Sequence, residues 1–382
     1  MAAVIESCGV GLYVHVPFCK SRCIYCDFYS TTLSQVWQIP YVEALEREMR
    51  LRRTGGEIRT LYIGGGTPSL LTAETLTALF GAIERNFTLA EGAEITLEAN
   101  PDDVSEHWVE VLQQTPVNRV SMGVQSLDNR VLDTLHRRHT AEQARRSVSL
   151  LKEAGYHNLS LDLIYGLPGQ TREQFCRDVE EVLALGIPHL SAYALQFEEG
   201  TSLFRLRQEG LVREADEELS LGCYERLIDL TAEAGLEHYE ISNFARPGFR
   251  SRHNASYWTG VPYIGLGAGA HSYDGQRVRS YNCEDVKRYI QHLTEGRLPA
   301  ETEVLTTDEL YNERIMLSLR TCEGLSLTAL EQDFGQERRA YCERMAEPHI
   351  RRGRLQRKTD ETLCLARQGL FVSDDIISDL IV

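Results

Sequence analysis

The stretch LYVHVPFCKSRCIYCDFYS, residues 12–30, places three cysteines directly after a predicted strand. They are Cys19, Cys23 and Cys26, and Phe28 stands two positions after the last of them. Three thiolates in so short a loop can converge on one metal centre, and the alternatives are a structural zinc site or cysteines that fill the core. Structural zinc takes four ligands, and no second close pair of cysteines follows in the sequence. The spacing therefore favours an iron–sulfur cluster, with one iron left open to a small molecule.

Strand patterns alternate with helix patterns from this stretch to about residue 197. Apolar or β-branched runs begin at Leu12, Thr60, Glu94, Asn118, Asn158 and His189. Amphipathic segments with apolar residues three and four positions apart lie between them, as over 41–53, 73–87 and 172–186. This alternation predicts a parallel sheet with right-handed crossovers. Six units fall short of the eight of a closed barrel, so we predict an α/β fold with a partial, TIM-like (β/α)6 barrel.

Glycine or polar residues stand where the predicted strands end. The cysteines follow the first strand and GGGTP, residues 64–68, follows the second. Glu98 ends the third strand, Gln125 ends the fourth, and Asp162 lies within the fifth. Because the carboxyl ends of parallel strands meet at one edge of the sheet, we expect these residues to share a site.

The pattern divides the chain into three parts. Residues 1–240 form the predicted partial barrel, 241–296 a connecting segment, and 297–382 a small C-terminal domain. In that domain, helical patterns precede a predicted hairpin in LQRKTDETLCLA, residues 355–366, as in a winged-helix unit. Its helices are acidic, which favours a lid or docking role over nucleic-acid binding.

Composition excludes some classes of partner. The formal net charge of the 382 residues is -16, which argues against nucleic acid or an anionic membrane surface as a partner. Neither a signal peptide nor a transmembrane segment is recognisable, and ten cysteines without an export signal indicate a reducing compartment. We therefore expect a cytoplasmic protein.

The CxxxCxxC motif, with Tyr25 just before its last cysteine, resembles that of the radical S-adenosylmethionine (SAM) superfamily. The resemblance implies a [4Fe-4S] cluster on the three cysteines, whose fourth iron is chelated by the amino and carboxylate groups of SAM. Electron transfer from the reduced cluster would then give methionine and a 5′-deoxyadenosyl radical. The resemblance also implies the remaining SAM-site residues, which are Tyr13, Tyr25, Gly65, Gly66, Thr67, Glu98, Gln125, Arg137 and Asp162. Arg137 suits a carboxylate because its planar fork can bind it bidentately, although Arg138 could take the same role.

Four motifs in order, YVHVPFC, GGGTPS, GVQS and DLIYGLPGQT, resemble a narrower family, the oxygen-independent coproporphyrinogen III oxidase-like proteins. The oxidase itself carries a fourth cysteine where this chain has Phe28, and it has a longer N-terminal extension. Both departures weigh against porphyrinogen oxidation.

The pattern HNxxYW resembles the signature of the HemW heme chaperones, a branch of that family. It comprises His253, Asn254, Tyr257 and Trp258. Histidine can bind heme iron axially, and aromatic rings offer flat apolar contact to the macrocycle. The alternative is a packed aromatic loop in which His253 only forms hydrogen bonds. His271 in GAGAHSY is a second candidate ligand.

The resemblance thus implies a heme chaperone with a [4Fe-4S] cluster, SAM and heme. Such a chaperone would transfer heme to an acceptor protein, which we expect to be a membrane-bound heme enzyme. The resemblance implies no catalytic residue. The alternative function is a radical SAM coproporphyrinogen III oxidase that decarboxylates propionate side chains. A third interpretation is a structural zinc protein.

Overall fold

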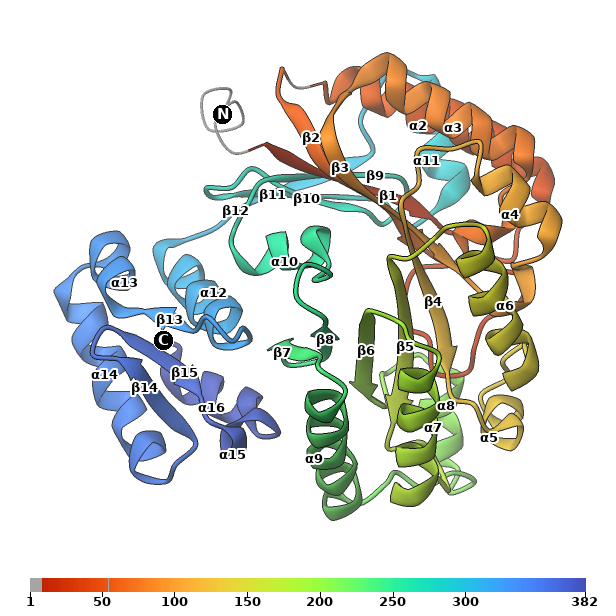
Figure 1. Ribbon diagram of the computed structural model, residues 1–382. Coiled ribbons are helices and arrows are strands. Elements are labelled where there is room, and N and C mark those ends of the chain that lie inside the picture. The colour runs from red at the N-terminus through yellow and green to blue at the C-terminus, as the bar shows by residue number, and fades with distance from the viewer. Residues whose placement is uncertain (1–8, 54) are drawn as a thin grey trace.

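A computed structural model describes residues 9–53 and 55–382 (Figure 1). Two sheets lie within these residues, one of twelve strands and one of three. The strand order of the large sheet is β12-β11-β10-β9-β1-β2-β3-β4-β5-β6-β8-β7.

Six parallel strands form the middle of the large sheet in sequence order, as predicted. They are β1 (Val10–Val16), β2 (Glu57–Gly65), β3 (Thr88–Ala99), β4 (Arg119–Gln125), β5 (Leu159–Tyr165) and β6 (His189–Ala194). Helices on the outer face connect them (Figure 1). These are α2 (Gln38–Leu51), α3 (Ala73–Asn86), α4 (Glu106–Leu112), α5 (Asn129–Thr134), α6 (Ala141–Glu153) and α7 (Arg172–Ala184). The α/β partial barrel is confirmed.

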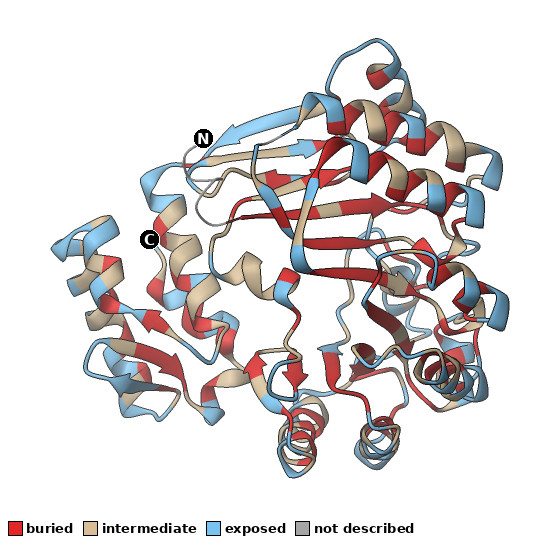
Figure 2. Cartoon of the chain, turned by 45° about the horizontal axis from the view of Figure 1, so that its top comes forward, coloured by how far each residue is buried: buried red, intermediate tan, exposed pale blue. Residues whose placement is uncertain are grey.

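Local sequence explains where several of these helices start. Thr140 begins α6 and Thr171 begins α7, each with a capping box completed by a glutamine three residues later. Strand β1 is buried on both faces except at Tyr13, as expected for a strand in the middle of a parallel sheet. Figure 2 shows the same distribution, with buried residues on the central strands and exposed residues on the outer helices and on β12.

The large sheet continues beyond the six strands at both edges. Helices α8 (Ser202–Gln208) and α9 (Glu217–Glu233) follow β6, and β8 (Asn243–Ala245) and β7 (Glu237–Glu240) then extend that edge. At the other edge lie β9 (Tyr263–Leu266), β10 (His271–Tyr273), β11 (Val278–Asn282) and β12 (Ala300–Val304). Helices α10 (Arg252–Trp258) and α11 (Val286–Thr294) lie between these strands in the sequence. The predicted connecting segment, 241–296, thus contributes the strands β8, β9, β10 and β11 to the large sheet.

The C-terminal unit has its own hydrophobic core and the three-stranded sheet. Its elements are α12 (Thr307–Leu319), β13 (Leu325–Ser326), α13 (Leu327–Phe334), α14 (Gln336–Arg351), β14 (Leu355–Thr359), β15 (Thr362–Leu365), α15 (Arg367–Leu370) and α16 (Ser373–Leu380). Strands β14 and β15 form the predicted hairpin, and α12 contacts α10 of the first unit (Figure 1). None of the helices in the described residues is both long and apolar enough for a membrane span.

Candidate functional site

The cysteine loop leaves β1 at Pro17 and is fixed by backbone hydrogen bonds. The N–H of Cys19 donates to the carbonyl of Thr31 at 2.9 Å, and the N–H of Cys26 donates to that of Cys23 at 3.2 Å. The loop thus holds its three cysteines beside the carboxyl end of β2.

The glycines after β2 allow a close approach to this loop. A Cβ at Gly66 would lie 2.8 Å from the backbone of Pro17, and one at Gly65 would lie 2.6 Å from the His15 ring. Gly65 also has a φ of +113°, which side chains rarely tolerate. The chain therefore needs glycine at both positions to pack the end of β2 against the cysteine loop.

A cavity of about 180 Å³, the cysteine cavity, collects nearly all of the residues predicted for the cluster and SAM. Its lining includes Cys19, Cys23 and Cys26 together with Tyr25, Gly65, Gly66, Thr67, Glu98, Gln125, Arg137 and Asp162. Tyr13 is the exception, because it lines a different cavity. The carboxyl ends of five neighbouring strands thus meet at one site.

Gln125 has an unusual backbone conformation at this site. Its φ of 68° lies in the left-handed region, which is uncommon for residues other than glycine and clusters at functional sites. The residue ends β4 and its side chain lines the cysteine cavity.

The two neighbouring arginines have different surroundings. Arg137 donates from Nη1 to Cys23 Sγ at 3.2 Å and from Nη2 to Asn100 Oδ1 at 2.6 Å, while its buried Nε has no partner in the described part of the chain. Arg138 forms ion pairs with Asp102 and Asp103, at 2.8 and 3.1 Å. Arg137 is therefore the arginine that contacts a cysteine directly, whereas Arg138 is paired with aspartates.

Two carboxyl groups lie in the same cavity. Burial raises the pKa of Glu98 to about 7, while the hydrogen bond donated by Tyr62 at 2.7 Å opposes the shift. Burial also raises the pKa of Asp162 to about 6, against hydrogen bonds from Ser191 and Ser121. Perturbed carboxyl groups in a cleft are typical of functional sites.

The shift at Glu98 predicts a pH dependence of stability. The unfolded chain loses this proton near pH 4.5, whereas the folded chain keeps it to about pH 7. Between these values the unfolded state binds fewer protons than the folded state. The free energy of unfolding therefore falls as the pH rises, by up to about 1.4 kcal/mol per pH unit. Glu98→Gln cannot ionise, and its stability relative to wild type should rise through this window and then level off. Urea denaturation at about pH 5 and about pH 8 measures this difference, and a constant difference would contradict the assignment.

The donor set fits an iron–sulfur cluster. Burial raises the pKa of the Cys19 thiol, and it raises that of Cys26 to about 11, so bound thiolates need nearby positive charge. Arg137 supplies part of it, and iron would supply the rest. Across residues 9–53 and 55–382, no three His, Cys, Asp or Glu side chains approach closely enough to hold a single metal ion. In a cluster each thiolate binds a different iron, so three thiols around one cavity suit it better than a tetrahedral zinc site.

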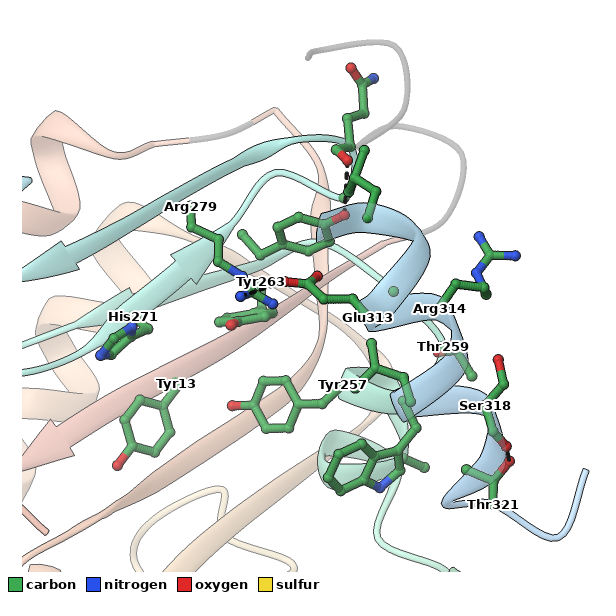
Figure 3. A pocket seen from close by; sticks show the side chains of 18 of the residues that line it. Tyr13, Tyr257, Thr259, Tyr263, His271, Arg279, Glu313, Arg314, Ser318 and Thr321 are labelled. Atoms are coloured by element: carbon green, nitrogen blue, oxygen red, sulfur yellow. Dashed lines mark hydrogen bonds and ion pairs between the residues drawn. The ribbon is translucent and has the colours of Figure 1, made fainter. Parts of the chain in front are cut away.

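A second, larger cavity of about 1640 Å³ lies between the barrel and the C-terminal unit, and we call it the aromatic cavity (Figure 3). The phenylalanine, tyrosine and tryptophan side chains that line it are Tyr13, Phe28, Tyr29, Tyr239, Tyr257, Trp258, Tyr263, Tyr273 and Phe334. Arg279 of β11 reaches across to Glu313 of α12 at 2.7 Å (Figure 3). The C-terminal unit therefore forms one wall of this cavity.

Only two of the four HNxxYW residues line the aromatic cavity. Tyr257 and Trp258 line the cavity, whereas His253 and Asn254 do not. His253 is 1% exposed; its Nδ1 lies 2.9 Å from Thr60 Oγ1 and its Nε2 lies 2.8 Å from Tyr257 Oη. Burial lowers the pKa of this ring to about 3. With both nitrogens engaged, His253 is a packing residue in this structure, and its contacts do not favour the predicted ligand role.

Sequence reasoning missed most of the aromatic cavity. Tyr263 and Tyr273 come from short strands, and Arg279 and Glu313 come from two separate units. The sequence signals were the HNxxYW motif and the dense tyrosine and glycine content that follows it. The second candidate ligand, His271, does line this cavity.

One layer of side chains separates the two cavities. Phe28 lines both of them. Buried Tyr62 stacks on Tyr13 of the aromatic cavity, with ring centroids 6.2 Å apart, and donates to Glu98 of the cysteine cavity. Groups bound in the two cavities would therefore be near neighbours.

Comparison with known proteins gives the following similarities. Residues 13–182 match the model of the radical SAM superfamily, and residues 305–372 match that of the HemN C-terminal domain. The heme chaperone HemW of Lactococcus lactis is 40% identical, covering 84% of each chain. HemW of Bacillus subtilis is 34% identical, and the match covers 95% of this chain and 97% of that one. HemW of Escherichia coli is 36% identical, and the match covers 85% of this chain and 87% of that one.

The structure of coproporphyrinogen III oxidase (HemN) from Escherichia coli has the same fold. Its TM-score is 0.84, and the match covers 98% of this chain and 90% of that one at 24% identity. This likeness establishes the architecture, including the C-terminal unit.

Proposed function

The chain belongs to the heme chaperone HemW family, and from that membership we propose that it binds heme and passes it to an acceptor protein. Heme would occupy the aromatic cavity, and the acceptor would be a heme protein, such as a membrane-bound heme enzyme. We place this exchange in the cytoplasm.

The aromatic cavity is the observation that carries this proposal. Its volume of about 1640 Å³ exceeds the roughly 300–1,000 Å³ of a typical small-molecule pocket. Its aromatic lining suits a flat macrocycle, because ring faces and edges supply extended apolar contact. Arg277, Arg279 and Arg314 also line it, and guanidinium groups suit the propionate carboxylates of heme. Arg279 is paired with Glu313 and Arg314 with Asp333, so a propionate would compete with these carboxylates.

The cysteine cavity would hold the other cofactors. We propose a [4Fe-4S] cluster on Cys19, Cys23 and Cys26, with SAM beside it among the residues of the same cavity. When bound, a reduced cluster of this kind can supply one electron to SAM. The chain itself leaves the three cysteines partly exposed, and Arg137 places positive charge at Cys23.

A second candidate function is oxidation of coproporphyrinogen III, which the likeness to the HemN fold favours. Phe28 opposes it, because the oxidase has a cysteine at that position. An anaerobic assay with reductant, SAM and coproporphyrinogen III distinguishes the two functions. Catalytic formation of protoporphyrinogen together with 5′-deoxyadenosine would replace the chaperone proposal.

Phe28 offers a direct test of the heme site. Its side chain is 66% exposed and lines the aromatic cavity, so Phe28→Ala should leave the fold intact. Contact with a macrocycle would bury this ring, which is worth roughly 1.5–3 kcal/mol, or about 10- to 150-fold in affinity. Anaerobic heme titration followed at the Soret band should show weaker binding by the variant.

Leu211→Ala is the matched control, because Leu211 is 70% exposed and lines neither of the two cavities. It should bind heme as wild type does. Equal affinities in all three proteins would place heme elsewhere, and no saturable binding by wild type would reject the chaperone function.

A further inference from the structure

We propose that His271 of β10 is the axial ligand of heme iron in the aromatic cavity. This assignment rests on the proposed heme-binding function and adds the residue that holds the iron. The sequence motif drew attention to His253, but the contacts of the described residues favour His271.

Strand alternation points His271 into the cavity. Residues two apart share a face of a strand, and His271 and Tyr273 both line the cavity, while Ser272 between them is buried. The Ser272 hydroxyl accepts a hydrogen bond from the N–H of Gly265 at 2.9 Å. A Cβ at Gly265 would lie 1.9 Å from the His271 carbonyl oxygen, so the glycine lets β9 and β10 pack closely. The backbone that carries His271 is therefore well fixed.

The imidazole of His271 is available as a ligand. The residue is exposed, and neither of its ring nitrogens forms a hydrogen bond with another residue in 9–53 or 55–382. Its ring stacks on Tyr281, with centroids 5.7 Å apart, which limits its orientation. Neutral imidazole with a free nitrogen is the common protein ligand of heme iron.

The other histidine of the cavity is not available. His15 is 5% exposed; its Nδ1 lies 3.0 Å from Tyr13 Oη and its Nε2 lies 2.9 Å from the Tyr29 carbonyl oxygen. The described lining holds no cysteine or methionine. Tyrosine can also ligate heme iron, which makes Tyr263 the alternative that an experiment must exclude.

Tyr263 of β9 and Tyr273 of β10 carry rings into the cavity that His271 also lines, and the Arg279 guanidinium lies 5.8 Å from the centroid of the Tyr273 ring. The Tyr263 and Tyr273 rings are 6.3 Å apart, and the Tyr257 ring meets Tyr263 edge-on at 4.8 Å. Figure 3 shows His271 at one end of these rings, near Tyr13 and Tyr263. These rings supply apolar faces and edges to a porphyrin in the same cavity that His271 lines.

The test is a titration of the full chain with ferric heme, compared for wild type, His271→Ala and the control His107→Ala. His107 is exposed on α4 and lies outside both cavities. Removing a residue that only hydrogen-bonds to a metal ligand costs about 10- to 100-fold in metal affinity. Removing the ligand itself should cost at least as much, so we expect His271→Ala to bind heme at least about tenfold more weakly than wild type does. Resonance Raman of the ferrous complex should show an iron–imidazole stretch in wild type and in the control, but not in His271→Ala.

Added imidazole separates ligation from a structural effect. It should restore the nitrogen-ligated spectrum of His271→Ala if the variant has lost only the ligand. An unchanged iron–imidazole stretch in the variant, or a phenolate-ligated spectrum in wild type, would overturn the assignment while leaving heme binding intact. Absence of saturable heme binding by wild type would instead reject the proposed function itself.

Discussion

Cys23→Ala is expected to abolish assembly of the iron–sulfur cluster. It removes one of three thiols around the cysteine cavity, and it leaves the Nη1 of Arg137 without the sulfur that it contacts at 3.2 Å. With only two thiolates, a second iron of the cluster would have no protein ligand, in addition to the iron that SAM binds. Anaerobic reconstitution with iron and sulfide should give brown wild-type protein and a nearly colourless variant, with bound iron and sulfide measured chemically.

Cys176→Ala is the control, because Cys176 is a half-buried thiol of α7 that lies outside both cavities. It should reconstitute as wild type does. If wild type stays colourless and retains zinc instead, the structural zinc interpretation is correct. If Cys23→Ala keeps full iron and sulfide, the cluster has other ligands.

The barrel could be predicted from sequence because its strands are long and buried. Strand β1 has burial on both faces, and its apolar run stands out against the helical patterns that follow. The added strands could not be predicted in the same way. Strand β10 has three residues, and β12 (AETEV) is exposed along most of its length, so neither carries an apolar pattern. Their strand conformation depends on pairing with a sheet that forms elsewhere in the chain.

The cysteine cavity could also be predicted, because topology determines it. Once six parallel strands are assigned, Glu98, Gln125 and Asp162 must come to one edge of the sheet. Tyr13, which was predicted for the SAM site, lines the aromatic cavity instead, because it lies three residues before the end of β1.

The HNxxYW motif shows what a sequence pattern leaves open. His253 and Tyr257 are four residues apart and share one face of α10, but the sequence does not say whether that face meets the sheet or a cavity. The histidine is held by Thr60 of β2, which belongs to a distant part of the chain. The motif thus locates the aromatic cavity, whereas the ligand that we propose comes from the following strands.

Glu48 anchors the edge of the sheet that carries this proposed ligand. The side chain is 0% exposed and accepts hydrogen bonds from Arg52 Nε at 2.8 Å and from the Tyr289 hydroxyl at 2.6 Å. It also accepts from the N–H of Gly267 at 2.9 Å and from Asn282 at 2.8 Å. One carboxylate therefore ties α2 to α11, β11 and the turn between β9 and β10.

Glu48→Ala is therefore expected to lower the free energy of unfolding by about 3–5 kcal/mol, because it leaves the partly buried Arg52 charge and several buried donors unpaired. Glu46→Ala on the same helix is the control. Glu46 forms ion pairs with the exposed side chains of Arg50 and Arg85, and such surface pairs are worth only about 0–1 kcal/mol. Urea denaturation followed by circular dichroism measures both changes. Equal losses in the two variants would mean that the buried network does not hold this edge of the sheet, and that the position of β10 depends on strand pairing alone.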